Sequence, residues 1–314
     1  ARTDVLVRVR AGGICGTDLH IFHGTSPVAT YPRVIGHEFV GEVVARGEGV
    51  TRVREGDRVV VEPIFFCGTC YPCSIGRPNV CERLEVMGVH RDGGFQEYVV
   101  VPERNVHPFS KDIPWEEAAL MEPFTIVLQV VDRGKITASD KVFIIGAGPI
   151  GLCLLVYLKY LGACCGISDV LPERLERART LGADFVVHAR EDNLEEDVFR
   201  YFPGGAHVVI DAVGLPETFA QAVRLASRAG RVVVLGFHTV PSPIPQAPIT
   251  LRELTIVGSR LQAHKFPQVV RLFEERKLHP ERLVSHVFPC EKVHEAFALL
   301  EEHPETTCKV LLTF

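Results

Sequence analysis

The sequence predicts an α/β protein in which a mostly β segment precedes a parallel sheet covered by helices on both faces. Three observations lead to this fold class. Residues 1–123 contain short valine-rich segments separated by glycine and proline, which is typical of short strands joined by turns. From 124 to 264, strand-like and helix-like segments alternate, which indicates repeated strand–helix units. Residues 265–314 then return to helices and a closing strand.

The individual elements follow from these patterns in chain order. In the first segment, strands are expected near 5–7, 39–44, 58–61 and 98–101. In the second segment, strands are expected at 141–145, 164–169, 185–188, 207–213, 231–235 and 254–258. Helices are expected between them at 149–161, 172–181, 194–200 and 216–227, with a proline-rich loop at 239–248. In the tail, the expected elements are helices at 266–276 and 293–301 and a strand at 308–313.

The composition is that of a soluble globular protein with a large core. Of 314 residues, 46% are hydrophobic and 23% are charged, and the net charge of −5 gives no reason to expect nucleic acid or an anionic membrane as a partner. No apolar run reaches the ~20 residues that a membrane span needs. The charged first residues do not form a signal peptide, so a cytoplasmic location is expected.

Four clustered cysteines form the most specific local pattern. Cys67, Cys70, Cys73 and Cys81 follow the spacing C-x2-C-x2-C-x7-C within one glycine- and proline-containing loop. Ordinary buried thiols or two disulfides are the alternatives, but this spacing favours a closed four-thiolate site for a structural zinc ion. A closed site holds structure, so any chemistry must take place elsewhere.

A glycine-rich turn stands where a dinucleotide would bind. The segment from Gly146 to Gly151 follows an expected strand and opens an expected helix, with Pro149 and Ile150 at the helix start. Gly146 allows the tight turn, Gly148 lets the backbone approach a pyrophosphate, and Gly151 allows close packing of helix and strand. A strand–helix turn that binds no nucleotide is the alternative, and the flanking elements argue against it.

The residue that ends the next expected strand predicts the choice of nucleotide. Asp169 is placed to accept hydrogen bonds from an adenosine ribose, and it would repel a 2′-phosphate. Val170 follows it instead of a basic residue, which favours NAD over NADP. Arg174 is also placed to contact the ribose edge, so NADP stays open.

Residues able to form a reactive metal site are scattered through the first segment. Cys15 stands outside the cysteine cluster, His37 and Glu38 are adjacent, and Glu122 precedes the alternating segment. Thiolate, imidazole and carboxylate together make a catalytic zinc set with an open position. Each residue alone is more often a core thiol or a solvated side chain, and spacing cannot bring them together.

In these motifs the chain resembles the zinc-containing medium-chain dehydrogenases of the alcohol dehydrogenase superfamily. The resemblance rests on Gly36-His37-Glu38 with Gly41 and Gly47, on the four-cysteine loop, and on the glycine-rich turn, and it spans essentially the whole chain. Gly56-Asp57-Arg58-Val59, Glu62-Pro63 and Met121-Glu122-Pro123 resemble the polyol dehydrogenase branch. The segment 88–95 is most similar to L-galactonate-type sugar-acid oxidoreductases.

This resemblance implies a fold and a set of roles. Residues 1–123 and 265–314 would form a GroES-like catalytic domain, residues 124–264 a Rossmann domain, and the active site would lie between them. Cys15, His37 and Glu122 would hold the catalytic zinc, with Glu38 as an alternative ligand or a close neighbour. Asp18 would orient His37. Thr17 and His20 match the proton-relay positions of the family.

The implied activity is hydride transfer from a secondary alcohol of a polyol or sugar acid to NAD+, with two zinc ions in each chain. The alternatives are an L-threonine 3-dehydrogenase and a nucleotide-binding structural or regulatory protein without catalysis. His90, Arg91 and Arg260 are candidates for holding a polar substrate. Strand 254–258 is expected at the sheet edge, where pairing with a second copy gives a homodimer or homotetramer.

Two features depart from the family pattern. Relatives carry a further segment before the part that matches Ala1 to Arg10, so a truncated N-terminus is expected here. Gln129 stands where many relatives have histidine, which is not expected to affect zinc binding.

Overall fold

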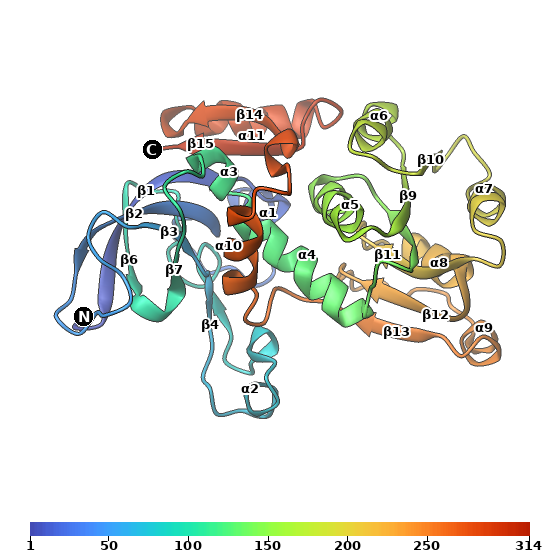
Figure 1. The fold of residues 1–314 in the computed structure, drawn as a ribbon, viewed down its shortest axis with the longest axis horizontal. Coiled ribbons are helices and arrows are strands. Elements are labelled where there is room, and N and C mark those ends of the chain that lie inside the picture. The colour runs from blue at the N-terminus through green and yellow to red at the C-terminus, as the bar shows by residue number, and fades with distance from the viewer. The chain divides into compact units, whose positions relative to one another are not determined.

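The computed structural model describes all 314 residues, and the chain divides into two compact units (Figure 1). Residues 1–125 and 262–314 form the first unit, and residues 126–261 form the second. Both ends of the chain therefore belong to one unit. None of the helices combines the length and the apolar composition that a membrane crossing requires.

A seven-stranded sheet forms the first unit, and strands from both ends of the chain contribute to it. Its order is β14 (Val284–Pro289), β15 (Lys309–Thr313), β1 (Asp4–Gly13), β2 (Glu38–Arg46), β3 (Arg58–Val61) and β7 (Val106–Pro108), with β6 (Tyr98–Pro102) also paired to β1. In register, Gly13 lies opposite both Glu38 and Leu311. The end of β1 is thus flanked by the start of β2 and by the middle of β15.

Short elements complete this unit. The strands β4 (Ile64–Phe65) and β5 (Glu85–Val86) form a separate pair beside the helix α2 (Tyr71–Ser74). The other helices are α1 (Gly16–Phe22), α3 (Trp115–Ala118), α10 (Phe266–Glu274) and α11 (Val293–Glu302), together with the start of α4 (Met121–Gly134). Single 3-10 turns lie at Pro78–Val80, Glu103–Asn105, Pro280–Leu283 and Cys290–Lys292. A valine-rich core that includes Val7, Phe39, Val59 and Val101 fills the inside of the sheet.

The second unit is a six-stranded parallel sheet. Its order is β10 (Phe185–His188), β9 (Cys164–Asp169), β8 (Lys141–Ile145), β11 (Ala206–Asp211), β12 (Ala226–Val234) and β13 (Thr255–Gly258). Numbered within the unit, this is 3-2-1-4-5-6, the order of a Rossmann sheet. Its helices are α5 (Pro149–Leu161), α6 (Pro172–Thr180), α7 (Leu194–Tyr201), α8 (Pro216–Leu225) and α9 (Gln246–Leu251). The expected fold class is confirmed.

Local signals explain where these elements begin and end. The helix α5 starts at Pro149, whose missing N–H costs nothing in the first turn, and it stops at Gly162 with φ of 92°. Four differences from the expected elements stand out. Strand β11 ends at Asp211 rather than at 213, because its carboxylate accepts the N–H groups of Val213 and Gly214 and turns the chain.

The other three differences concern elements that patterns alone did not reveal. The helix α9 begins inside the segment expected to be a loop, and Pro245 is its N-cap residue. Strand β14 is only half-buried and therefore lacks a strong apolar alternation. The short helix α1 is too brief to show helical periodicity. The expected edge position of the last strand, β13, is confirmed.

Candidate active site and metal centres

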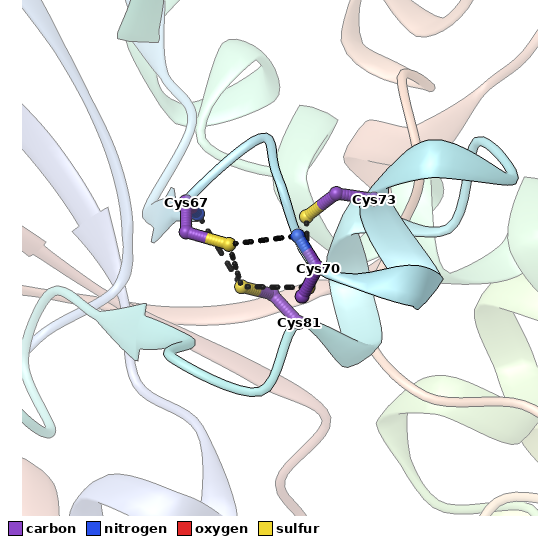
Figure 2. A group of neighbouring side chains, drawn as sticks. All are labelled: Cys67, Cys70, Cys73 and Cys81. Carbon is purple, nitrogen blue, oxygen red and sulfur yellow. Dashed lines mark hydrogen bonds between the residues drawn. The ribbon is translucent and has the colours of Figure 1, made fainter.

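The four-cysteine lobe brings its sulfur atoms together, and Figure 2 shows the four side chains converging from one loop. The Sγ atoms are 3.4 Å apart for Cys70 and Cys73, 3.7 Å for Cys70 and Cys81, and 3.5 Å for Cys81 and Cys67. These separations are far longer than a disulfide bond, and all four thiols are free. Zinc–sulfur bonds of about 2.3 Å in a tetrahedron place sulfur atoms about 3.8 Å apart, so the lobe fits a zinc ion.

Backbone N–H groups favour a thiolate at Cys67 in this lobe. The backbone N–H groups of Thr69 and Cys70 both donate to Cys67 Sγ at 3.4 Å. These bonds, with that of Thr69 first, lower the pKa of the Cys67 thiol to about 4. Gly68 and Gly76 have φ of 76° and 75°, so the turns that aim these groups need glycine.

A second set of ligand atoms forms where β1 and β2 pair. Cys15 follows β1 directly, and His37 and Glu38 stand at the start of β2. Because the two strands are antiparallel, with Gly13 opposite Glu38, the three side chains meet. One ligand atom from each of Cys15, His37 and Glu38 lies within 4.8 Å of the other two. The structure thus brings together three of the residues expected to surround the catalytic metal.

The Asp18 carboxylate holds the backbone on both sides of this ligand set. It is fully buried, and its carboxylate accepts the backbone N–H groups of Cys15 at 2.9 Å and of Gly36 at 3.1 Å. His37 Nδ1 lies 3.4 Å from Asp18 Oδ1 and is a buried atom without a hydrogen bond. Burial lowers the pKa of His37, but the Asp18 carboxylate outweighs it and raises that pKa well above its ordinary value.

The donor chemistry of this set fits zinc. A thiol, an imidazole and a carboxylate are the groups found in catalytic zinc sites that keep one position open. The geometry and the ligand types of Cys15, His37 and Glu38 therefore fit a zinc ion.

Glu122 lies beside this set without joining it. It stands in the first turn of α4, is 3% exposed, and is outside the three atoms that lie within 4.8 Å of one another. Burial, and next the charge of Glu38, raise the pKa of Glu122 to about 8. Its assignment as the lasting zinc ligand, with Glu38 as the exchangeable one, stays a prediction.

One further side chain in this site was not predicted from the sequence. Lys309, the first residue of β15, is 3% exposed, and its Nζ donates a hydrogen bond to Glu38 Oε2. The only signal for it in the sequence is a lysine at the start of an otherwise mainly apolar strand. Such a lysine is expected to be buried, and a buried lysine is almost always paired with a negative charge.

The two relay candidates are placed differently. Thr17 Oγ1 lies 3.8 Å from Cys15 Sγ, next to the ligand set. His20 is exposed on α1, and its Nδ1 lies 3.2 Å from Thr25 Oγ1. Thr17 is therefore at the site, whereas His20 faces solvent.

The candidates for substrate contacts have other partners. His90 Nδ1 accepts the backbone N–H of Val86 at 3.0 Å. Arg91 pairs with Glu85 at 2.6 Å and lies over the Phe65 ring. Both stabilise their own loop, and Arg260 belongs to the second unit.

The glycine-rich turn in the second unit has the expected form. Gly146 has φ of 100°, and a Cβ on Gly151 would collide with Gly146 O. Beside Gly148, by contrast, a Cβ would meet only Arg174 Nη1, at 4.0 Å. The turn therefore leaves open space at the N-terminus of α5, which fits a pyrophosphate.

The Asp169 carboxylate supports this turn. It accepts the N–H groups of Ala147 at 2.8 Å, Val170 at 2.8 Å and Leu171 at 3.0 Å, and Arg174 Nη1 lies 3.8 Å away. A carboxylate offers about four acceptor positions, so about one is left for a ribose hydroxyl.

Comparison with known proteins places the chain in a family. Residues 1–111 match the alcohol dehydrogenase GroES-like domain, and residues 149–275 match the zinc-binding dehydrogenase domain. Starvation-sensing protein RspB of Escherichia coli K12 is 45% identical over 313 residues, which are 99% of this chain and 92% of that protein. L-galactonate-5-dehydrogenase of the same organism is 34% identical over 94% of this chain and 87% of that protein. The chain belongs to the zinc-binding alcohol dehydrogenase family.

A solved structure agrees with the fold of this zinc-binding alcohol dehydrogenase. The E. coli CFT073 protein rspB, described as a short chain alcohol dehydrogenase complexed with NADH, is 44% identical and superposes with a TM-score of 0.95 over 100% of this chain and 93% of that one. The predicted family, the oxidoreductase class and the use of zinc and NAD(P) are thereby confirmed.

Proposed function

We propose that this zinc-type dehydrogenase oxidises a secondary alcohol of a polyol or sugar acid to a ketone, with NAD+ as the hydride acceptor. The balanced reaction releases one ketone, one NADH and one proton for each alcohol. The meeting of Cys15, His37 and Glu38 carries the proposal, because an open zinc site is needed for catalysis and not for structure.

The side chains of the first unit divide the work. A zinc ion held by Cys15, His37 and a carboxylate from Glu122 or Glu38 would supply Lewis acidity to the substrate hydroxyl. Asp18 fixes the imidazole of His37 and the start of α1, which keeps the ligand set in place. In this proposal, the Thr17 hydroxyl beside Cys15 takes part in removing the substrate proton, and exposed His20 passes it to solvent.

The second unit supplies the nucleotide site in this proposal. Gly146, Gly148 and Gly151 shape the turn, and Pro149 and Ile150 open the helix whose N-terminus would face the pyrophosphate. Asp169 favours NAD, while Arg174 lies within 3.8 Å of it. Replacing Asp169 with alanine and Val170 with arginine should shift preference towards NADP, measured as the ratio of kcat/KM values. A wild-type protein that already prefers NADP would contradict the role given to Asp169.

A substrate panel tests the activity. The purified protein is incubated with NAD+ and with sugar alcohols, aldonates or L-threonine, and NADH formation is followed by absorbance. Turnover is expected with a polyol or sugar acid, and His37→Ala serves as the control without activity. Turnover with L-threonine alone would support the alternative threonine dehydrogenase. A protein with only the lobe zinc and no turnover on any compound would support a role without catalysis.

We also propose a homodimer or homotetramer. Strand β13 is the edge of its sheet, and an edge strand offers unpaired backbone groups to a second copy. Size-exclusion chromatography should give a dimer or tetramer at micromolar concentration, and a monomer would contradict the proposal.

A further inference from the structure

We propose that Glu62 is a positioning residue for the reaction: it holds Gln262, so that the chain returning from the second unit enters the first unit at one fixed point. This inference rests on the proposed function, in which the nucleotide of the second unit accepts a hydride from an alcohol held by the first. Glu62 belongs to neither set of metal-ligand candidates, so the proposal gives a role to a buried carboxylate that has none so far.

The chain passes between the two units at two places, and only one of them is a helix. The first passage lies between residues 125 and 126, inside the unbroken helix α4. The second lies between Leu261 and Gln262, in a segment that is neither helix nor strand. Hydrogen bonds along a helix fix its backbone, whereas a segment without them bends at its own dihedral angles. The second passage is therefore the one that other contacts have to fix.

The second unit fixes this segment up to residue 259. Arg133 Nε of α4 donates to Gly258 O at 3.0 Å. The backbone N–H of Ser259 donates to Val234 O, at the end of β12, at 2.9 Å. The parallel sheet thus holds its last strand and the residue that follows it.

The first unit takes hold of the segment at Gln262. This side chain is 1% exposed, its Nε2 donates to Glu62 Oε1 at 2.7 Å, and its Oε1 accepts the Lys265 N–H at 2.8 Å. His107 Nε2 lies 2.9 Å from the other carboxylate oxygen, Glu62 Oε2, and the His107 ring stacks on Phe266 at 5.0 Å. Two residues, 260 and 261, are left between this anchor and the one in the second unit.

Glu62 is itself held by its own backbone. Its N–H donates to Asn105 O at 2.7 Å, and Asn105 Nδ2 donates to Glu62 O and to Ile64 O, both at 2.9 Å. Buried polar groups with every partner in place are rigid. The carboxylate therefore offers Gln262 a fixed acceptor.

The backbone on both sides of Gln262 also has to be held. Leu261 and His264 have φ of 47° and 57°, in the left-handed region that residues other than glycine rarely adopt. Such a backbone persists only where surrounding contacts enforce it. The hydrogen bonds of Gln262, which lies between these two residues, are contacts of this kind.

The variant Gln262→Met tests the role in turnover, because methionine is flexible and unbranched and has no amide to bond Glu62. Zinc content and the dissociation constant of NADH, measured by fluorescence, should equal those of the wild type, since neither site is touched. The kcat on the substrate found in the panel should fall about 10-fold, because small displacements that arise far from the chemistry slow the bound complex.

Hydrogen exchange at the Lys265 N–H, followed by NMR, gives a second readout that needs no turnover. In the wild type this group should exchange slowly, because the buried Gln262 Oε1 accepts it. In Gln262→Met its exchange should be about 10-fold faster, on the scale of one lost hydrogen bond.

Four further variants separate positioning from general damage. Gln268→Met is the matched control, since Gln268 is exposed on α10, and it should behave as the wild type. Glu62→Ala should lower kcat as much as Gln262→Met does, and the two changes combined should cost no more than either alone, because both remove one interaction. Glu62→Gln keeps an oxygen that accepts from Gln262, so its kcat should stay near that of the wild type.

The outcomes distinguish the two proposals. A kcat of Gln262→Met equal to that of the wild type would overturn the positioning role while the dehydrogenase proposal stands. Equal losses in Glu62→Gln and Glu62→Ala would also overturn it, because the charge and not the held amide would then matter. If Gln262→Met does not fold, fast exchange at the Lys265 N–H of the wild type overturns the anchor. A wild-type protein without turnover on any compound would instead overturn the proposed function.

Discussion

The two candidate metal centres of the first unit are built in opposite ways. The lobe takes all four ligands from residues 67–81 of one loop, and their sulfur atoms converge there (Figure 2). The other centre brings together Cys15 after β1 with His37 and Glu38 at the start of β2, and Glu122 of α4 and Lys309 of β15 lie beside them. The lobe is formed by residues close together in the sequence, whereas the Cys15 centre is formed by the pairing of strands.

Their chemistry differs in the same way. The lobe holds only thiols, and the sulfur atoms of Cys67 and Cys81 accept nearby backbone N–H groups. The Cys15 centre mixes thiol, imidazole and carboxylate, and buried charges surround it. A set of four thiolates closes around a metal, while a mixed set of three leaves a position for substrate. Changes in the two centres should therefore affect different properties of the protein.

The largest effect is expected from His37→Ala. The change removes a ligand from the Cys15 centre, so turnover should fall by more than about 100-fold, beyond the loss from a supporting group. The melting temperature should change little in comparison, because the lobe is untouched. Steady-state kinetics on the substrate found in the panel and a thermal melt measure the two. Near-normal turnover of His37→Ala would contradict the assignment of the Cys15 centre as the catalytic one.

The opposite pattern is expected from Cys73→Ser. Loss of one lobe thiolate weakens a structural zinc, whose binding energy is part of the folding energy. The melting temperature should fall by roughly 5–10 °C, with a smaller effect on turnover per folded molecule. Calorimetry and kinetics at low temperature provide the comparison. If turnover per folded molecule falls sharply while the melting temperature stays near that of the wild type, then the lobe has a role in catalysis that its geometry does not explain.

A smaller effect should separate the two carboxylates of the Cys15 centre. Glu122→Ala should lower zinc affinity or turnover by about 10–100-fold, on the scale of groups that support a metal. Glu38→Ala should slow catalysis while the zinc stays bound. Metal analysis after dialysis, paired with kinetics, measures both variants. Zinc lost from Glu38→Ala and kept by Glu122→Ala would reverse the two assignments.

The smallest effect is expected from Arg83→Met. Arg83 is exposed beside the lobe, and its Nη2 donates to Thr69 Oγ1 at 3.1 Å. Solvent screens such a charge, so the melting temperature should stay within about 1 °C of the wild type. Lys309→Met removes a buried cation beside the Cys15 centre, so it should lower the melting temperature more than Arg83→Met does. A marked loss of stability in Arg83→Met would show that the lobe also depends on a nearby charge.

This contrast also explains what could be predicted from the sequence. The lobe and the glycine-rich turn are local, so the spacing of Cys67 to Cys81 and of Gly146 to Gly151 was enough to predict them. Strands such as β8 and β9 were predicted with their observed bounds, since runs of mainly apolar or small residues are typical of buried parallel strands. The meeting of Cys15 with His37 depends on the pairing of β1 and β2, which spacing does not reveal.

Lys309 shows this limit most clearly. It is far from Glu38 along the chain, and no motif marks it. Its partner is set by the register of β15 on β1 and of β1 on β2, together with the space left at Gly13. A family resemblance supplied Cys15, His37 and Glu122 as a group, but it did not supply the lysine that pairs with Glu38.

Zinc content per chain tests most directly whether the protein has one closed and one open metal centre. Metal analysis of the wild-type protein should give two zinc ions per chain, and Cys15→Ser should give one. The remaining ion should be lost when Cys73→Ser is added. A wild-type protein with a single zinc ion that survives Cys15→Ser would contradict the assignment of the Cys15 centre as the catalytic metal site.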